Sequence, residues 1–252
     1  MSRKNRCLIA LAAAYVVGLH LFVFVTILKT DLLERAGARL GLRFGNEFSI
    51  DARAFRSAQF LLDRIDQTMR KSPVVFMGDS IMEGLPPLHG IPRSMNLALG
   101  GSTSLRTAAM IGGYRNIDHV AAVVLGVGIN DLCGERPSAQ EFESRLRKLS
   151  AALPTGVRVV WSSILPVDPN SPRAACTIDP DVVRQANSRI AALCKDRAAC
   201  IYSDGYSKLA GVGGHLPPQF HVGDGLHLSP LGYEVWSAQL RQDLVRAGVT
   251  TR

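Results

Sequence analysis

The sequence contains a serine, a histidine and an aspartate in settings that suit covalent catalysis. Ser80 closes the tripeptide Gly-Asp-Ser directly after the apolar run 74–77. A hydroxyl on a tight turn after a strand is exposed, so it can attack an electrophilic carbon. Asp224 precedes His227 by three residues, a spacing at which a carboxylate can orient an imidazole whose Nε2 faces a serine. Each pattern alone is also typical of a turn or a helix start, so only their combination indicates chemistry.

Two further segments can stabilise a negative charge that develops in a reaction. Gly100 and Gly101 follow a second apolar run, and paired glycines let a backbone N–H approach a ligand closely. Asn130 follows a third run, and its side-chain amide can donate to an oxyanion without carrying charge. The alternatives are an ordinary glycine loop and an Asn-Asp turn or helix cap.

From residue 73 onward, short apolar runs rich in β-branched residues alternate with helical stretches. These patterns predict strands at 74–77, 95–99, 121–127, 157–164 and 200–203, and helices at 103–113, 138–152, 180–197 and 229–247. Near-continuous apolar strands separated by helices are typical of a parallel sheet covered on both faces. We therefore expect an α/β fold, a flavodoxin-like three-layer α/β/α sandwich with a parallel sheet of about five strands. In such sheets the chemistry lies at the carboxyl ends of the strands, where the four segments fall.

The four segments, taken in this order, resemble the sequence blocks of the GDSL, or SGNH, hydrolase superfamily. The resemblance covers about residues 73–247. It implies a serine esterase in which Ser80 is the nucleophile, His227 is the general base and Asp224 orients that base. The implied oxyanion hole consists of the backbone amides of Ser80 and Gly101 with the side chain of Asn130. The resemblance implies no cofactor.

Three details of the resemblance concern the loops around these residues. Alignment on the second block of the family places its glycine at Gly101 rather than at Gly100. Ile81 stands where the family usually has leucine, and Ser102 stands where an aspartate often follows the glycine. Neither departure changes a catalytic group. The sequence has neither a His-Glu-x-x-His motif nor a Cys/His quartet, so we expect no metal.

The N-terminal segment is apolar enough to cross a membrane. Residues 7–28 form a run of 22 without a formal charge, and about 20 apolar residues span a hydrocarbon core of roughly 30 Å. We expect a short cytoplasmic tail at 1–6, a transmembrane signal anchor at 7–28, a juxtamembrane helical region at 29–72 and the SGNH hydrolase domain at 73–252. A cleaved signal peptide and a buried helix are the alternatives for the apolar run.

The basic excess of the chain lies beside this segment. The net charge is +8, and the first 72 residues hold 12 Lys and Arg against 6 Asp and Glu. The rest is nearly neutral, which argues against nucleic acid as a partner and favours anionic lipid near the anchor. Basic residues on both sides of the run make the positive-inside count nearly a tie. Because a very short basic N-terminus usually stays cytoplasmic, we expect a single-pass protein of the bacterial inner membrane with its catalytic domain in the periplasm.

The predicted hydrolase domain contains an even set of four cysteines, namely Cys133, Cys176, Cys194 and Cys200. They lack the close Cys-x-x-Cys pairs of a zinc site, and an oxidising compartment would allow two disulfides. The predicted topology places the first two at the carboxyl edge of the sheet and the last two at the opposite edge. Crossed pairs would then exceed the Cα separation of a disulfide. We expect Cys133–Cys176 and Cys194–Cys200, and the alternative is four free thiols.

These features predict a membrane-anchored serine ester hydrolase that deacylates, and more narrowly deacetylates, cell-surface or exported polysaccharide. The anchor motivates this substrate, since a tethered enzyme meets polymers as they leave the membrane. One alternative is a lysophospholipase or thioesterase that acts on lipid acyl groups. Others are an O-acyltransferase and a non-catalytic accessory subunit of a polysaccharide synthesis or export machinery. His89, His215 and His221 lie in loops rich in proline and glycine, and we expect them at the surface, with a place in the lining of the substrate cleft as the alternative.

Overall fold

The computed structural model describes residues 15, 18–20, 73–91 and 93–249. The chain divides into two compact units, Met1–Arg56 and Ser57–Arg252. The four described residues of the first unit are helical. No helix among the described residues has the length and apolar composition to cross a bilayer. Apart from those four positions, the predicted anchor at 7–28 and the juxtamembrane region at 29–72 lie outside the described residues.

Among the residues that the structure describes, five parallel strands form one sheet. Their bounds are Val74–Gly78 (β1), Ser94–Asn96 (β2), Ala122–Gly126 (β3), Val159–Ser162 (β4) and Cys200–Ser203 (β5). The spatial order is β2-β1-β3-β4-β5, with every neighbouring pair parallel, which is the flavodoxin-like order. The residues of β1 and β4 are all buried, as expected for strands covered on both faces. The predicted α/β fold with a five-stranded parallel sheet is confirmed.

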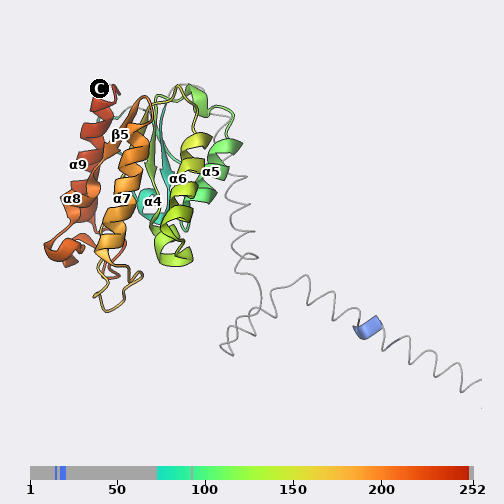
Figure 1. Cartoon of the computed structure of the whole chain (residues 1–252), viewed down its shortest axis with the longest axis vertical. Coiled ribbons are helices and arrows are strands. Elements are labelled where there is room, and N and C mark those ends of the chain that lie inside the picture. Colours follow the sequence, from blue (N-terminus) through green and yellow to red (C-terminus); the bar gives the residue numbers. More distant parts are fainter. Residues whose placement is uncertain (1–14, 16–17, 21–72, 92, 250–252) are drawn as a thin grey trace, which may run out of the picture. The chain divides into compact units, whose positions relative to one another are not determined.

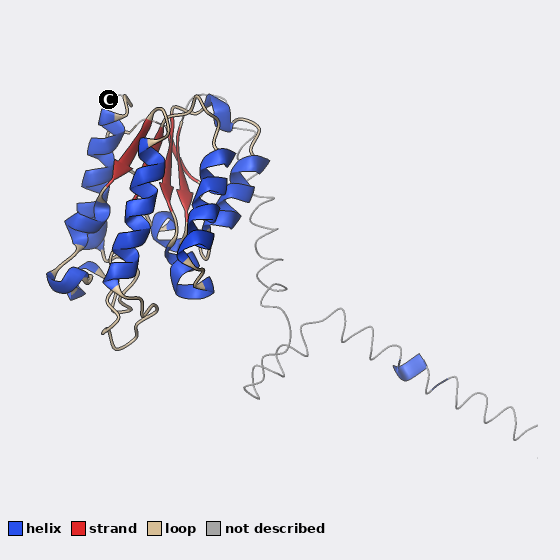
Figure 2. Ribbon diagram, in the orientation of Figure 1, coloured by secondary structure: helices blue, strands red, loops and turns tan. Residues whose placement is uncertain are grey.

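Helices cover both faces of this sheet, as Figures 1 and 2 show. They are α4 (Ser80–Glu83), α5 (Ser104–Gly113), α6 (Ala139–Ala152), α7 (Pro180–Lys195), α8 (Gly205–Leu209) and α9 (Pro230–Arg246). On one face of the sheet, α6 packs between α5 and α7. The helix α9 packs against β4 and β5. A Cβ added to Gly126 would meet both Met82 of α4 and Trp236 of α9, so α4 and α9 share the other face. The handedness of the crossovers explains why α4 lies on the face opposite α5, α6 and α7, because the step from β1 to β2 runs opposite to the three later steps.

Several short elements were not predicted. They are α4, α8, the 3₁₀ turns η1 (Ile117–His119), η3 (Val212–Gly214) and η4 (Pro218–Phe220), and the π-helical turn η2 (Asp131–Glu135). A single turn contains no repeat of apolar positions, so periodicity cannot indicate it. Three strands, β2, β3 and β4, are also shorter than predicted. Residues 97–99 and 163–164 lie outside the strand bounds, although the amides of Leu97, Leu99 and Ser163 still donate to carbonyl oxygens of the neighbouring strands.

The longer helices begin at local capping signals. Ser138 accepts a hydrogen bond from the Glu141 amide, and the Glu141 carboxylate accepts one from the Ser138 N–H, which makes a capping box at α6. Asp179 caps α7 and Ser229 caps α9, each followed by proline at the first helical position. These boundaries are therefore encoded within a few residues of each helix start.

The carboxyl ends of β1 and β3 meet without side chains. Gly78 pairs with Gly126 at the last rung of the ladder. A Cβ added to Gly78 would overlap the carbonyl oxygen of Gly126, so the close approach requires glycine. Met82 and Trp236 lie over Gly126 on the same face. The missing side chains therefore let α4 and α9 sit against the end of the sheet.

Gly78→Ala is expected to lower the free energy of unfolding by about 1–3 kcal/mol, the usual cost of overpacking. The reason is that the added methyl group meets backbone, which cannot move aside as a side chain can. Chemical denaturation of the purified protein measures the change. Gly112→Ala is the matched control, because a Cβ at this helical position has no atom within 4 Å. It should raise stability by about 0.5–1 kcal/mol, and equal effects at both positions would contradict the close packing.

Candidate active site

Ser80 and His227 come into contact although 147 residues separate them. Ser80 Oγ lies 2.9 Å from His227 Nε2, and His227 Nδ1 lies 2.6 Å from Asp224 Oδ2. The side chains of His227 and Asp224 are 39% and 24% exposed, so a substrate can reach the imidazole from solvent. The structure thus brings together the residues predicted as nucleophile, base and orienting carboxylate in one hydrogen-bonded chain.

The turn between β1 and α4 positions Ser80. β1 ends at Gly78, Asp79 is the N-cap of α4, and Ser80 is the first helical residue. Asp79 Oδ1 accepts a hydrogen bond of 3.0 Å from the Ile81 amide, which holds the turn in shape. The Ser80 side chain is half-buried and lies at the carboxyl edge of the sheet, where the strand pattern predicts it.

Asp224 uses both carboxylate oxygens to hold His227. Oδ2 faces the imidazole Nδ1, and Oδ1 accepts hydrogen bonds of 3.0 Å from the amides of Leu226 and His227. Partial burial acts to raise the pKa of Asp224. The hydrogen bonds from the His227 side chain and from the two amides outweigh burial and hold this pKa below its ordinary value. The carboxylate is therefore ionised at neutral pH and can fix the imidazole with Nε2 toward Ser80.

The turn after β3 is fastened to the start of α5. Asn130 is the N-cap of η2, and its Nδ2 atom donates a hydrogen bond of 3.0 Å to the carbonyl oxygen of Ser102. Asp131 is fully buried and accepts hydrogen bonds from the amide and the hydroxyl of Ser104, while Arg145 of α6 donates to its other oxygen. Burial raises the pKa of Asp131, although the bonds from Ser104 and Arg145 oppose the shift. Asp131 thus holds Asn130 next to the glycine loop.

The glycine loop passes beside Ser80. Gly101 has a φ of +73°, in the left-handed region that favours glycine. A Cβ added to Gly100 would lie 3.7 Å from the Cβ of Ser80. The Gly100 amide donates to the Glu83 carboxylate at 3.0 Å, whereas no group in the described part of the chain accepts from the Gly101 amide. Of the two glycine amides, that of Gly101 is therefore free to bind a substrate.

His221, which we expected at the surface, holds together residues 221–228. This stretch contains the predicted carboxylate Asp224 and the predicted base His227, and we call it the acid–base segment. His221 is buried instead. Its Nδ1 atom accepts hydrogen bonds from the amides of Gly223 at 2.9 Å and Gly225 at 3.1 Å, and a bridge to Leu228 closes the segment. The surface prediction is wrong because local composition does not show which loop will pack over a residue.

The loop 165–179 holds the acid–base segment from outside. The backbone amides of Asp168 and Ala175 donate to the carbonyl oxygens of Gly225 and Asp224, at 2.7 and 2.9 Å. A Cβ added to Gly225 would overlap the carbonyl oxygen of Asp168, so this approach also requires glycine. The position of the orienting carboxylate therefore depends on a loop from elsewhere in the chain.

Two disulfides are present in the structure. Cys133 pairs with Cys176 at a Cα separation of 5.6 Å, and Cys194 pairs with Cys200 at 5.3 Å. These are the pairs expected from the predicted topology. The first joins the loop 165–179 to η2, directly after Asn130. No group of three or more His, Cys, Asp or Glu side chains in the described part of the chain could hold a metal ion.

A cavity of about 20 Å³ lies between the carboxyl ends of the strands and α9, and Ser80 is not among its lining residues. Asp79 and Ile81, the neighbours of Ser80, line it together with Ile129, the neighbour of Asn130. The other lining residues are Gly126, Val127, Ser163, Ile164, Leu165 and Trp236. A space of this size holds about one water molecule.

Residues 76–235 match the GDSL-like lipase/acylhydrolase family, and the match spans more than half of the chain. The chain belongs to this family, so the predicted resemblance is confirmed and the protein is a carboxylic ester hydrolase. No curated protein matches its sequence.

Solved structures share the fold at low sequence identity. A GDSL-like lipase from Bacteroides thetaiotaomicron is 22% identical with a TM-score of 0.61, over 77% of this chain and 99% of that one. An acetyl xylan esterase from Geobacillus stearothermophilus is 18% identical with a TM-score of 0.53, over 73% and 99%. The C-terminal catalytic domain of peptidoglycan O-acetyltransferase A from Streptococcus pneumoniae is 14% identical with a TM-score of 0.52, over 72% and 99%. At these identities the likeness shows the fold alone.

His221→Leu is expected to lower kcat for ester hydrolysis by about tenfold or more, because two amides of the acid–base segment lose their acceptor. His221→Asn places an oxygen near the position of Nδ1 and should recover part of the loss. Steady-state kinetics on p-nitrophenyl acetate, with a denaturation curve for each variant, measures the effect. His119→Leu is the control, since that imidazole is 67% exposed. A leucine variant at 221 with wild-type kcat would show that the segment holds its shape without this acceptor.

Asp79 is a second buried group next to the site, and its titration is testable. Burial raises the pKa of Asp79 from 3.8 to about 7, although the amides of Ile81 and Met82 and the charge of His227 oppose the shift. Between these pH values the folded protein keeps a proton that the unfolded chain loses. The stability contributed by the protonated group is therefore full below about pH 4 and is lost as the pH rises toward 7.

Asp79→Asn should remove this dependence, because the amide is neutral and its oxygen can still accept from Ile81. Relative to wild type, the variant should gain up to about 4 kcal/mol in unfolding free energy between pH 4 and pH 8. Urea denaturation at both pH values measures the gain. Asp179→Asn, at the exposed N-cap of α7, controls for the loss of an N-cap carboxylate as such. If the free energy of unfolding of Asp79→Asn differs from that of wild type by the same amount at pH 4 and pH 8, Asp79 is not buried in its protonated form.

Proposed function

We propose that this protein hydrolyses esters through Ser80, His227 and Asp224, and that its substrate is acetylated polysaccharide at the cell surface or in export. The observation that carries the proposal is the hydrogen-bonded chain from Ser80 Oγ through the His227 imidazole to Asp224, at 2.9 and 2.6 Å. In this arrangement the hydroxyl has a base within reach, and the base has a carboxylate that sets its tautomer.

The reaction proceeds through an acyl-enzyme. Ser80 Oγ attacks the carbonyl carbon of the ester while His227 Nε2 takes the hydroxyl proton, and Asp224 stabilises the imidazolium that forms. The tetrahedral intermediate collapses and releases the alcohol, which takes the proton from His227. Water then attacks the acyl-enzyme with His227 again acting as base, and the free acid leaves.

Three donors are assigned to the oxyanion of the tetrahedral intermediate. Within the described residues, the amides of Ser80 and Gly101 donate to no protein group. Asn130 uses one N–H on Ser102, and its amide nitrogen carries a second hydrogen. Removing one such donor typically costs about 3–4 kcal/mol of transition-state stabilisation. The bond from Gly100 to Glu83 supports Gly101 as the glycine donor.

Acetyl is proposed as the acyl group from the chemistry for which structural neighbours are named. Two structural neighbours, an acetyl xylan esterase and a peptidoglycan O-acetyltransferase, are named for acetyl chemistry on polymers, which fits the same substrate class.

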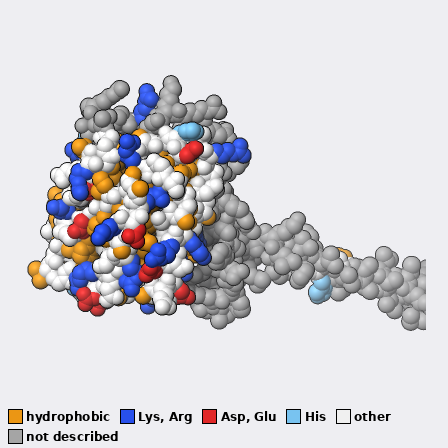
Figure 3. Space-filling model, turned by 45° about the horizontal axis from the view of Figure 1, so that its top comes forward, with side chains coloured by type: hydrophobic (Ala, Val, Ile, Leu, Met, Phe, Trp, Pro, Cys, Tyr) orange, Lys and Arg blue, Asp and Glu red, His pale blue; other side chains and the backbone are white. Residues whose placement is uncertain are grey.

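The proposed location is the periplasm, with residues 7–28 as a membrane anchor. The uncharged run of 22 residues and the basic residues before it support the anchor. Two disulfides in the hydrolase domain suit an oxidising compartment. The basic excess of the chain lies in residues 1–72, which hold 12 Lys and Arg against 6 Asp and Glu, and Figure 3 shows basic and acidic side chains interspersed on one face of the domain.

Ser80→Ala should abolish hydrolysis of p-nitrophenyl acetate, by several orders of magnitude in kcat, without unfolding the protein. Asn130→Ala should cost about 10²–10³-fold, because two backbone donors remain. Ser188→Ala, an exposed serine on α7, is the control. Wild-type rates should fall along the p-nitrophenyl esters from acetate to laurate. Full activity of Ser80→Ala would sink the mechanism, and faster cleavage of the longer esters would point to lipid instead.

Reporter fusions test the topology. Alkaline phosphatase joined after Arg252 should be active, whereas a fluorescent protein that folds only in the cytoplasm should stay dark at the same position. Deleting residues 1–28 should reverse both signals, since the proposed anchor is then missing. Fluorescence without phosphatase activity in the full chain would place the domain in the cytoplasm and weaken the polysaccharide assignment.

A further inference from the structure

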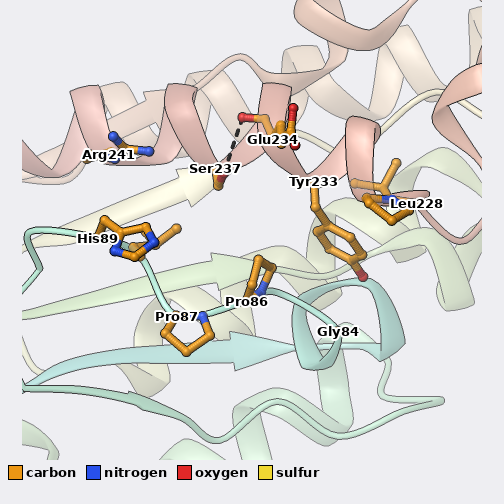
Figure 4. Close-up of a pocket in the computed structure, with 11 residues that line it drawn as sticks. Gly84, Pro86, Pro87, His89, Leu228, Tyr233, Glu234, Ser237 and Arg241 are labelled. Atoms are coloured by element: carbon orange, nitrogen blue, oxygen red, sulfur yellow. Dashed lines mark hydrogen bonds between the residues drawn. The ribbon is translucent and has the colours of Figure 1, made fainter.

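A second, larger pocket of about 700 Å³ lies between α9 and the segment 84–89 (Figure 4). This volume is in the range of small-ligand sites. The sequence explains why the space exists, because α4 ends at Glu83 after one turn and Pro86-Pro87 cannot continue the helix. The described chain beside this part of α9 is therefore an irregular segment instead of a longer helix.

The pocket has an apolar side and a polar side. The segment 84–89 contributes mainly apolar side chains, namely Pro86, Pro87 and Leu88. α9 contributes polar side chains at helical spacing, namely Glu234, Ser237 and Arg241. In Figure 4, Tyr233 lies at the end near Gly84, whereas Arg241 and His89 lie at the other end. Such walls match a ligand with both apolar faces and polar edges.

The two charged side chains of the pocket, Glu234 and Arg241, have no ion-pair partner in the described part of the chain. Arg241 Nε is buried and has no hydrogen-bond partner, and a buried donor without an acceptor is unfavourable. A fatty chain would desolvate both charges without replacing their hydrogen bonds. The opposite signs favour a neutral ligand rich in hydroxyl groups over a strong anion.

The pocket adjoins the proposed active site. Gly84 ends the helix that Ser80 begins, and one helical turn advances about 5.4 Å. Leu228, which follows the base His227, also lines the pocket. The Tyr233 hydroxyl donates to the carbonyl oxygen of Ile81 at 2.8 Å. Burial, with the nearby carboxylates, raises the pKa of Tyr233 to about 12, so this hydroxyl stays protonated and keeps the ring at the rim nearest Ser80.

We infer that this pocket is a saccharide subsite, which holds a neutral sugar unit adjacent to the unit whose acetyl group Ser80 attacks. The inference rests on the proposed function. The C–H face of a pyranose ring can stack on Tyr233, since an aromatic face is electronegative. Its hydroxyl groups can bind the Glu234 carboxylate and the Arg241 guanidinium in charge-assisted hydrogen bonds.

The test compares a substrate that reaches the pocket with one that does not. The purified full-length chain is assayed on acetylated xylo-oligosaccharides and cello-oligosaccharides, and on p-nitrophenyl acetate. Arg241→Ala removes a ligand contact, and Ser237→Trp fills the pocket. Their matched controls are Arg147→Ala, an exposed arginine on α6, and Ala238→Trp, the exposed neighbour of Ser237 on α9.

The pocket variants should lower the ratio of kcat/KM for saccharide to kcat/KM for p-nitrophenyl acetate by about tenfold or more, mainly through KM. The controls should keep the wild-type ratio. An unchanged ratio in Arg241→Ala and Ser237→Trp would overturn the subsite, as would a wild-type enzyme that cleaves p-nitrophenyl acetate but no acetylated oligosaccharide. A wild-type chain inactive on p-nitrophenyl acetate would overturn the proposed function, and the subsite with it.

Discussion

The parallel pairing of β1 with β3 determines where the chemistry of this protein can take place. The two strands end together, with Gly78 beside Gly126, and each continues into a turn with a proposed functional side chain, Ser80 after β1 and Asn130 after β3. Because both terminal residues lack side chains, α4 and α9 can approach the strand ends closely. A methyl group at position 78 would meet a backbone oxygen, so the spacing of the two turns depends on this contact.

Buried polar groups help to hold the loops around the site. Asp131 ties the Asn130 turn to α5, and His221 gathers two amides of the acid–base segment. A typical hydrogen bond contributes about 0.5–1.5 kcal/mol, and breaking one leaves a buried group unpaired. Loops held in this way keep one geometry. The residues that position the proposed catalytic groups are therefore as important to the site as those groups themselves.

α9 connects the catalytic edge with the larger pocket. Its inner side carries Trp236, whose Nε1 donates to the Ser162 hydroxyl at 3.1 Å in the core. Its other side presents Glu234 and Arg241 to the pocket. The helix begins directly after the acid–base segment, so packing that fixes α9 on the sheet also fixes the spacing between His227 and the pocket. A polymer bound along α9 would thus meet the nucleophile in a defined register.

Local patterns in the sequence account for much of this protein. The apolar runs predict the five strands, the helical stretch predicted at 138–152 corresponds to α6, and the order of four short segments identifies the family and Ser80, Asp224 and His227 as its candidate site. The membrane segment at 7–28 stays a prediction from composition. These signals are readable because each lies within a few residues of chain, as periodicity and capping do.

Only the tertiary structure decided which distant segments meet. The burial of His221, the bonds of Asp131 to Ser104 and Arg145, and the pocket beside Pro86 all depend on contacts between elements far apart in the sequence. A histidine in a glycine-rich loop looks the same in sequence whether a second loop covers it or water does. Burial and hydrogen-bond pairing belong to the packed fold, because they are set by the neighbours that folding supplies.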